Sequence, residues 1–348
     1  MASGVVGVDI GSTGIRAVEV KGVGANPSIR KHGQVALPPG VVEGGVVVQP
    51  HAVTQALTQL WEEAKFSTNQ VRLGVGSSSV LARPLELDWM PQEDLRKSLR
   101  YQIEDLLPVP VDDANIDHIY LGEHTLPSDG VSPPRRMIRI LLIATARDGV
   151  DEMVRAVKGA KLQPVGVDLG ALALVRASAA AAPAAPSEAI LDIGVDKVTI
   201  AIHTRGRPHL IRVIPNVGSG LITRQLMEET GRDWPSAEQT KCSGIPLPAP
   251  GHSPASQDQA VIAGAVHRML TSTRDTLEFH ANTDPDSFPE SVKVHGAAVA
   301  LPGLLDQVSD ALGIPAYPYG TQAVTASGGP DQANLALPLG LCMEMTAS

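Results

Sequence analysis

The chain has 348 residues, of which 43% are hydrophobic and 3% aromatic, and its formal net charge is −9. This length suits two domains that each bury a core, and the acidic balance argues against a nucleic-acid partner. We find no signal-peptide pattern and no apolar run long enough for a transmembrane helix. Cys242 and Cys342 lie far apart without metal-like spacing. We therefore expect a cytoplasmic protein, with peripheral attachment to a membrane complex left open.

The first 80 residues predict strands around a glycine-rich turn, followed by a helix. Apolar runs at 5–10 and 15–20 enclose the turn Gly11-Ser12-Thr13-Gly14, which is a hairpin pattern. A short extended run at 34–37, a helix at 51–64 and a strand at 71–75 follow.

Residues 80–168 predict a small α/β unit with the order β, α, β, α, β. Its first helix lies between Pro91 and Pro108, and residues 125–136 are expected to form a loop between that helix and a strand at 137–144. The apolar stripe of this helix favours a core role over an interface role; its members are Leu95, Leu99, Ile103 and Leu106. The unit ends with a helix at 149–158 and a strand at 164–168.

The Ala- and Pro-rich stretch at 177–187 is the best domain boundary in the chain and is expected to be a surface loop or the end of a helix that begins at 170. The second half then predicts a hairpin at 189–203 and helices at 221–230, 236–242 and 257–280. A strand at 291–294, a turn at 296–298, a helix at 303–312 and a C-terminal helix after Pro338 complete it.

The hairpin at 189–203 repeats the pattern of the first one, with Asp192 in the place of Asp9. A glycine-rich turn lets backbone N–H groups approach an anion, and a hydroxyl at Ser12 or Thr13 can donate to the same phosphate. A carboxylate at the end of each first strand can hold a hydrated Mg²⁺. Two such turns facing each other would hold the phosphate tail of a nucleotide.

This arrangement resembles the actin-like ATPase superfamily, which includes actin, sugar kinases, heat-shock chaperone ATPases and the division protein FtsA. The resemblance implies an α/β, actin-like (ribonuclease H-like) two-domain fold with a small α/β subdomain inserted in the first half. The first phosphate motif of that superfamily matches Asp9, Gly11, Ser12 and Arg16, and the second matches Asp192 and Gly194.

Three further segments match superfamily motifs. Asp168 falls where a connecting-helix motif positions the attacking water, although a helix cap explains it equally well. Glu238 and Lys241 resemble a pair that touches ribose and adenine, with a solvated i, i+3 ion pair as the alternative. The adenosine motif corresponds to 292–315, with a turn at Gly296-Ala297-Ala298.

Two departures from the superfamily pattern argue against tight nucleotide binding, and more so against hydrolysis. Ala297 and Ala298 carry methyl groups where relatives have glycine. Val195 and Asp196 replace small residues in the second turn, and Asp196 adds a negative charge beside the phosphate position.

Almost the whole chain resembles the PilM family of type IV pilus assembly. Three segments show this resemblance: "VGVDIGSTGIRAVEV", "LPPGVVEGGVVVQPHAVTQALTQLWEEA" and "VGSSSVLARPLELDWMPQEDLRKSLRYQIEDLLPVPVDDANID". The third is the most specific. The family organisation implies a first domain at 1–79, an inserted subdomain at 80–168, a connecting helix and linker at 169–187, and a second domain at 188–348. In the second domain a small subdomain spans about 220–290, and the C-terminal helix returns to the first domain.

The resemblance implies an ATP-binding scaffold with Mg²⁺ as the metal and at most slow hydrolysis. It implies that the partner is the cytoplasmic tail of a PilN-type inner-membrane protein, which would place the chain at the inner membrane; pilus motor ATPases are further candidate partners. A nucleotide-free adaptor and an FtsA-like ATPase remain alternatives, as does a sugar kinase with Asp168 as base. The ending "ALPLGLCMEMTAS" has no Lys or Arg, which counts against an FtsA-like membrane helix.

Overall fold

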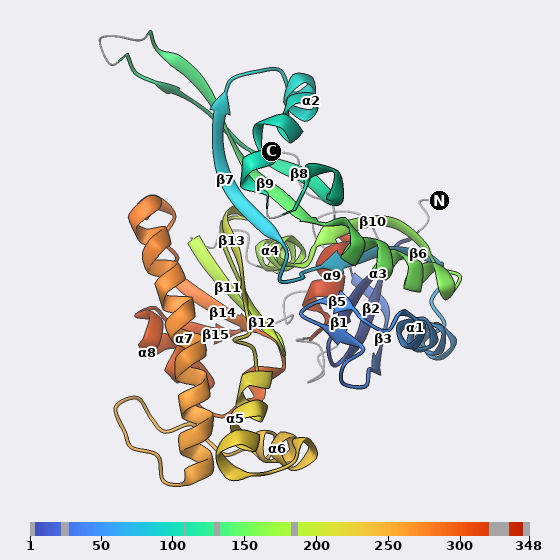
Figure 1. The fold of residues 1–348 in the computed structure, drawn as a ribbon, viewed down its shortest axis with the longest axis vertical. Coiled ribbons are helices and arrows are strands. Elements are labelled where there is room, and N and C mark those ends of the chain that lie inside the picture. Colours follow the sequence, from blue (N-terminus) through green and yellow to red (C-terminus); the bar gives the residue numbers. More distant parts are fainter. Residues whose placement is uncertain are drawn as a thin grey trace.

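The computed structural model describes residues 4–21, 28–107, 109–128, 133–181, 187–319 and 334–343. Two five-stranded sheets form the centres of two domains, and a three-stranded sheet forms a smaller unit that projects beyond them (Figure 1). This arrangement confirms the predicted α/β class. The two larger domains lie side by side, so that their sheets face a shared central region.

The first domain has the strand order β10-β6-β1-β2-β3. β1 pairs antiparallel with β2 and parallel with β6, so the predicted first hairpin is present. Short aliphatic side chains such as Val6 and Val8 are fully buried in this sheet. The strands are β1 Val6–Gly11, β2 Gly14–Lys21, β3 Ser28–Ala36, β6 Gln70–Val75 and β10 Gln163–Leu169, with a ribbon of β4 Val42–Glu43 and β5 Val46–Val47.

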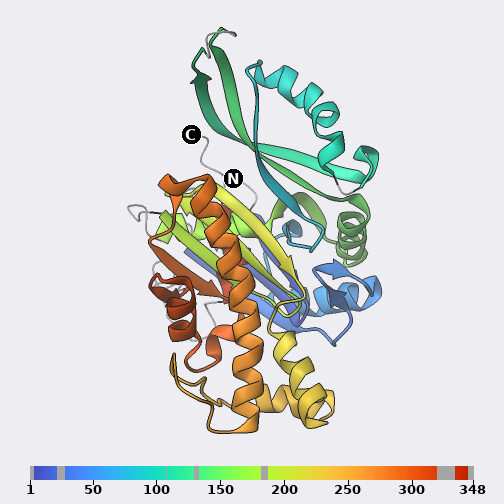
Figure 2. The same cartoon turned by 60° about the vertical axis from the view of Figure 1, so that its left-hand side comes forward.

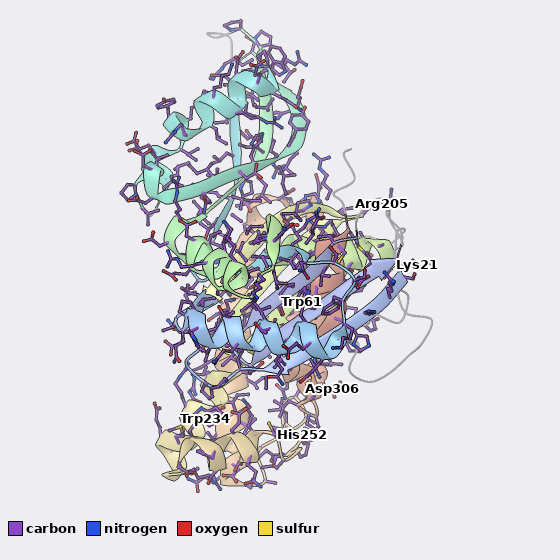
Figure 3. The ribbon with its side chains drawn as sticks, turned by 90° about the vertical axis from the view of Figure 1, so that its right-hand side faces the viewer. Lys21, Trp61, Arg205, Trp234, His252 and Asp306 are labelled. Atoms are coloured by element: carbon purple, nitrogen blue, oxygen red, sulfur yellow. The ribbon has the colours of Figure 1, made fainter. Side chains whose placement is uncertain are left out.

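Two helices, α1 Pro50–Ala64 and α3 Arg147–Gly159, pack beside each other on this domain. The apolar face of α1 buries Val53 and Leu57, which confirms the helical spacing read from the sequence. Figure 3 shows α1 crossing in front of the sheet, and Trp61 belongs to its last turn.

The helices α4 Gly170–Ala181 and α9 Ala336–Cys342 pack against each other, and α9 also contacts β1, β2 and β6. At two points the backbones approach each other directly. A Cβ atom on Gly7 would lie 1.9 Å from the carbonyl oxygen of Pro338, and one on Gly340 would lie 1.9 Å from that of Ala173. Only glycine therefore permits the helix to sit this close to both neighbours.

The second domain has the strand order β13-β12-β11-β14-β15, and the long helix α7 runs along its sheet (Figure 2). Its strands are β11 Ser187–Ile193, β12 Lys197–Thr204, β13 Arg207–Pro215, β14 Ser291–His295 and β15 Ala316–Pro318. Its helices are α5 Gly220–Thr230, α6 Trp234–Lys241, α7 Gln257–Thr283 and α8 Leu304–Leu312, with 3-10 turns at Pro285–Ser287 and Ala297–Ala300. In Figure 3, Trp234 marks the end of the molecule opposite the inserted unit.

The sequence analysis missed β13 and β15. Prolines 208 and 215 lie within β13, and proline removes a donor from the ladder, so the segment was not read as a strand. Both missed strands lie at the edges of the second sheet, where proline is tolerated.

The inserted unit is a sheet of order β7-β9-β8 covered by α2. Leu95 and Leu99 of α2 and Ile103 directly after it are buried against this sheet, and Leu106 is partly buried there, so the core reading of the stripe is correct. The elements are β7 Leu81–Asp88, α2 Gln92–Gln102, β8 Ala114–Leu126 and β9 Arg135–Ala146, with 3-10 turns at Glu104–Leu106 and Val111–Asp113.

Three expectations for residues 80–168 differ from the structure. β8 was missed because a bulge at Gly122, with φ of +130°, interrupts its alternation. The expected loop at 125–136 is shorter at both ends, because β8 and β9 extend into it; its residues 129–132 lie outside the described part. β10 pairs with β6, so it belongs to the sheet of the first domain instead of the inserted unit.

Candidate functional site

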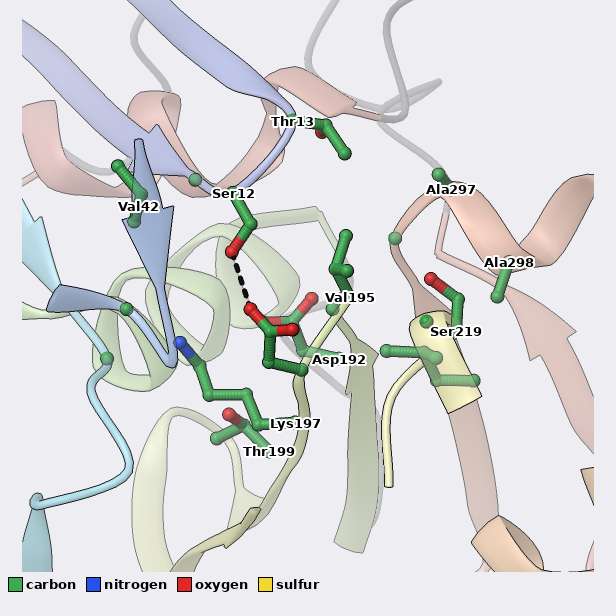
Figure 4. A pocket seen from close by; sticks show the side chains of 18 of the residues that line it. Ser12, Thr13, Val42, Asp192, Val195, Lys197, Thr199, Ser219, Ala297 and Ala298 are labelled. Atoms are coloured by element: carbon green, nitrogen blue, oxygen red, sulfur yellow. Dashed lines mark hydrogen bonds between the residues drawn. The ribbon is translucent and has the colours of Figure 1, made fainter. Parts of the chain in front are cut away.

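The two repeated turns line one cavity of about 830 Å³ between the two large domains. Every site residue predicted from the sequence lines this cavity except Asp168. The residues brought together are Asp9, Gly11, Ser12, Thr13, Arg16, Asp192, Gly194, Glu238, Lys241, Gly296 and Ala297. Figure 4 shows Ser12 and Thr13 entering from one side and Ala297 from the other.

In the first turn, the Asp9 carboxylate is paired with a cation. Asp9 and Arg16 are directly opposite each other in the β1–β2 ladder, and their side chains form an ion pair of 3.5 Å. Burial raises the pKa of Asp9 above its usual value, and the positive charge of Arg16 opposes this. The Arg16 Nε atom is buried and has no hydrogen-bond partner among the described residues.

In the second turn, Asp192 is paired with a histidine from a different strand. His295 lies opposite Asp192 in the parallel β11–β14 ladder, and its Nδ1 is 2.7 Å from the carboxylate. Burial alone would raise the pKa of Asp192, but the charge and hydrogen bond of His295 outweigh it, so the net pKa is lowered. The ring edge of His295 also meets Tyr319, at 5.5 Å between centroids.

Asp196 joins the two domains across the cavity. Its Oδ2 atom accepts a hydrogen bond of 2.9 Å from the Ser12 hydroxyl, which is the dashed line in Figure 4, and one of 3.1 Å from the backbone N–H of Gly44. The hydroxyl that the sequence assigned to a phosphate is therefore bound to a carboxylate of the chain itself. This contact brings the second turn against the first domain.

The side of the cavity formed by α5 and α6 contains the pair Glu238 and Lys241. Their side chains are 2.7 Å apart, and the Thr223 hydroxyl donates to the same Glu238 carboxylate at 2.7 Å. The pair forms the i, i+3 ion pair and lines the cavity, and its contact with ribose and adenine stays a prediction.

The turn after β14 depends on one glycine. Gly296 has φ of +101°, and a Cβ atom there would lie 2.3 Å from the carbonyl oxygen of Ile193. Ala297 and Ala298 follow in a 3-10 turn with negative φ, so alanine is compatible with the backbone there.

Asp168 does not line the cavity. Its carboxylate pairs with Arg176 of α4 and accepts a hydrogen bond of 2.7 Å from the N–H of Leu169. This geometry holds the start of α4 and supports a structural role for Asp168, not the positioning of an attacking water.

Several cavity residues were not predicted from the sequence. The Gly44-Gly45 turn between β4 and β5 reaches the second domain, and both residues have positive φ. A Gly-Gly pair is a turn signal that could have found them. The others come together only through the fold; they include Gly76, Ser78, Lys197, Ser219, Thr223, Arg224 and His295.

The acids of the cavity do not fit a directly bound divalent metal. Asp9 and Asp192 already have basic partners, and Asp196 accepts two hydrogen bonds. Within the described residues, no group of three or more His, Cys, Asp or Glu side chains could hold a metal ion. The described residues of the cavity therefore do not offer a direct Mg²⁺ site.

Comparison with known proteins gives one family and several solved structures with a similar fold. The family model of the type IV pilus assembly protein PilM matches residues 7–319. Among solved structures, a chain of a PilM–PilN type IV pilus biogenesis complex is similar with a TM-score of 0.82 at 23% identity, covering 97% of each chain. No helix in the described part of the chain is long and apolar enough to cross a membrane.

More distant structures share the fold. The ethanolamine utilization protein EutJ from Carboxydothermus hydrogenoformans has a TM-score of 0.58 at 16% identity, covering 99% of this chain and 90% of that one. MreB5 of Spiroplasma citri, bound to ADP, has a TM-score of 0.55 at 12% identity, covering 97% and 95%. The fold is thus the predicted actin-like one, and the match over 7–319 shows that the chain belongs to the PilM family of type IV pilus assembly proteins.

Proposed function

We propose that this chain is a pilus assembly scaffold that binds ATP between its two large domains. The observation that carries the proposal is the convergence of both hairpin turns, the Glu238–Lys241 pair and the Gly296 turn on one cavity of about 830 Å³. A cavity of this volume suits a ligand of nucleotide size. MreB5, which shares the fold, is bound to ADP in its structure, and this supports a nucleotide as the ligand.

Within this cavity the phosphates would lie between the Ser12 turn and the start of α5. Glycine turns and a helix N-terminus both present backbone N–H groups to an anion. The adenosine would lie between the Glu238–Lys241 pair and Ala297, both of which face the cavity.

The second part of the proposal concerns the partner. The similarity to a chain of a PilM–PilN complex supports binding of the cytoplasmic tail of a PilN-type inner-membrane protein, which would hold the chain at the membrane. Pilus motor ATPases are further candidate partners. Nucleotide would then act by favouring one domain arrangement, and with it one affinity for the tail.

We expect hydrolysis to be slow at most. Asp168, the predicted positioning residue, is bound to Arg176, and Asp9 is paired with Arg16. A nucleotide-free adaptor is the second candidate, and the Ser12–Asp196 hydrogen bond favours it, because this bond occupies the phosphate turn.

Calorimetric titration of ATP in magnesium buffer tests the proposal, with Gly11→Val as the blocking variant. A Cβ atom at Gly11 meets its nearest atom at 3.5 Å, so valine fits the strand end and extends into the phosphate turn. The matched control is Gly166→Val on β10, which is outside the cavity and has its nearest contact at 3.7 Å.

We expect micromolar binding by the wild type, at least about a tenfold loss in Gly11→Val, and no change in Gly166→Val. Absence of binding by the folded wild type would leave the nucleotide-free adaptor. Titration of a PilN-type tail peptide with and without ATP then tests the coupling between the two sites.

A further inference from the structure

The side chain of Lys197 extends into the cavity from the first residue of β12, directly after the second turn (Figure 4). Its ammonium nitrogen points toward the first domain. A Cβ atom on Gly45 would lie 2.5 Å from this nitrogen, and one on Gly76 would lie 4.0 Å from it. Gly45 of the first domain therefore leaves the space that the ammonium group occupies, and Gly76 lies within contact distance of it.

The ammonium group of Lys197 makes no hydrogen bond and no direct ion pair with any residue in the part of the chain that the structure describes, whereas its backbone oxygen accepts a hydrogen bond from the Gly194 N–H. Arg16 and Lys241 differ in this respect, because Arg16 is paired with Asp9 and Lys241 with Glu238. Arg224 also lines the cavity without an ion pair among the described residues, but it is exposed, whereas Lys197 is partly buried. Burial lowers the pKa of Lys197, whereas nearby carboxylates raise it. Burying an ammonium group that has no direct partner costs free energy, unless a ligand accepts its hydrogen bonds.

The carboxylates around Lys197 are close enough to act on its charge but already have their own partners. They are Asp192, held by His295, Asp9, held by Arg16, and Asp196, held by Ser12 and Gly44. A divalent metal at this position would meet an ammonium group and few free oxygen ligands, whereas Mg²⁺ requires a nearly octahedral shell of oxygens. Phosphate oxygens, in contrast, would give Lys197 the acceptors that it lacks.

We propose that Lys197 supplies the cation for the phosphates of the bound nucleotide, so that this chain binds ATP without a divalent metal. The inference rests on the proposed nucleotide site and specifies which group neutralises the ligand there. Lysine serves this purpose as a flexible point charge with three donors. Position 197 thereby takes over the electrostatic role that the sequence assigned to a magnesium ion between Asp9 and Asp192.

The test measures the affinity for ATP calorimetrically in two buffers, one with excess Mg²⁺ and one with EDTA. The wild type is expected to bind with dissociation constants that agree within about threefold. Lys197→Met is expected to lose at least about tenfold in affinity in EDTA. Lys158→Met, an exposed residue of α3 outside the cavity, is the matched control and is expected to bind as the wild type does in both buffers.

The outcomes distinguish a failure of the inference about Lys197 from a failure of the proposed nucleotide site. Binding by the wild type only with Mg²⁺ would overturn the role of Lys197 and leave the nucleotide site intact. Unchanged affinity of a folded Lys197→Met in EDTA would overturn it as well. No binding by the wild type in either buffer would overturn the nucleotide site itself. Thermal melting shows whether Lys197→Met is folded, and the comparison of buffers with the wild type needs no variant.

Discussion

The two hairpin turns of this chain have the same backbone pattern but different chemical partners. In the first, Asp9 meets Arg16 from the adjacent strand of its own hairpin. In the second, Asp192 meets His295 from a strand that is about 100 residues later in the chain. Burial prevails at Asp9, where the pKa is raised, and the partner prevails at Asp192, where it is lowered. A repeated motif thus fixes where a carboxylate lies but not the direction in which its pKa shifts.

The turns also differ in how tightly their glycines are packed. A Cβ atom on Gly14 would lie 2.5 Å from the backbone oxygen of Val35, which belongs to the neighbouring strand β3. A Cβ atom on Gly194 would lie 3.2 Å from the oxygen of Lys197, within its own hairpin. Gly14 is therefore locked against the neighbouring strand β3, whereas Gly194 contacts only its own hairpin.

The largest expected effect comes from exchanging these glycines for alanine. Gly14→Ala should lower the free energy of unfolding by about 3 kcal/mol, because β2 and β3 must move apart. Gly194→Ala should lower it by less than about 1 kcal/mol, because only the local turn must adjust. Urea unfolding of both variants without nucleotide measures the difference. Equal losses, or a larger loss at Gly194, would contradict the comparison.

The next effect concerns the contact between the turns. Asp196→Ala removes the acceptor of the Gly44 N–H, and a hydrogen bond to a charged group contributes about 2 kcal/mol. We expect hydrogen exchange at the Gly44 amide to become roughly tenfold faster or more, since the domains lose this contact. Mass spectrometry of a peptide that contains Gly44 provides the measurement. Asp310→Ala, an exposed residue of α8, is the control, and equal exchange in both variants would show that Asp196 does not hold the domains together.

The smallest expected effect is the dependence of stability on pH. Because the pKa of Asp192 is lowered from 3.8, its contribution is present above that pH and is lost as the pH falls through the lowered value. Because the pKa of Asp9 is raised from 3.8, its contribution is present below that pH and is lost as the pH rises through the raised value. The two acids thus act with opposite signs.

Two asparagine variants separate these contributions. Relative to the wild type, Asp9→Asn should gain stability as the pH rises above 3.8, and the deficit of Asp192→Asn should shrink as the pH falls below 3.8. Each difference can change by at most about 1.4 kcal/mol per pH unit. Denaturant unfolding at a series of pH values measures both slopes, with Asp310→Asn as control. Slopes of the same sign would contradict the assignment.

Elements with strong local patterns could be predicted from the sequence. The hairpin at β1–β2 and the helices α1 and α7 match their predicted positions because apolar periodicity and turn residues define them locally. The bulged strand β8 and the proline-containing β13 could not be found in this way. Both are held by pairing with a neighbouring strand, which outweighs their weak local preference.

The same distinction between local patterns and long-range contacts applies to the candidate site. The sequence alone determined the actin-like pattern, because each motif there is a short run of residues with its own local geometry. Only the tertiary structure decided what these residues contact. Asp196 accepts a hydrogen bond from the Ser12 hydroxyl, and Arg176 forms an ion pair with Asp168. The ammonium group of Lys197 has no direct partner among the described residues. The physical reason is distance along the chain. Ser12 and Asp196 are 184 residues apart, and no local pattern encodes which charges two domains bring together when they close over one cavity.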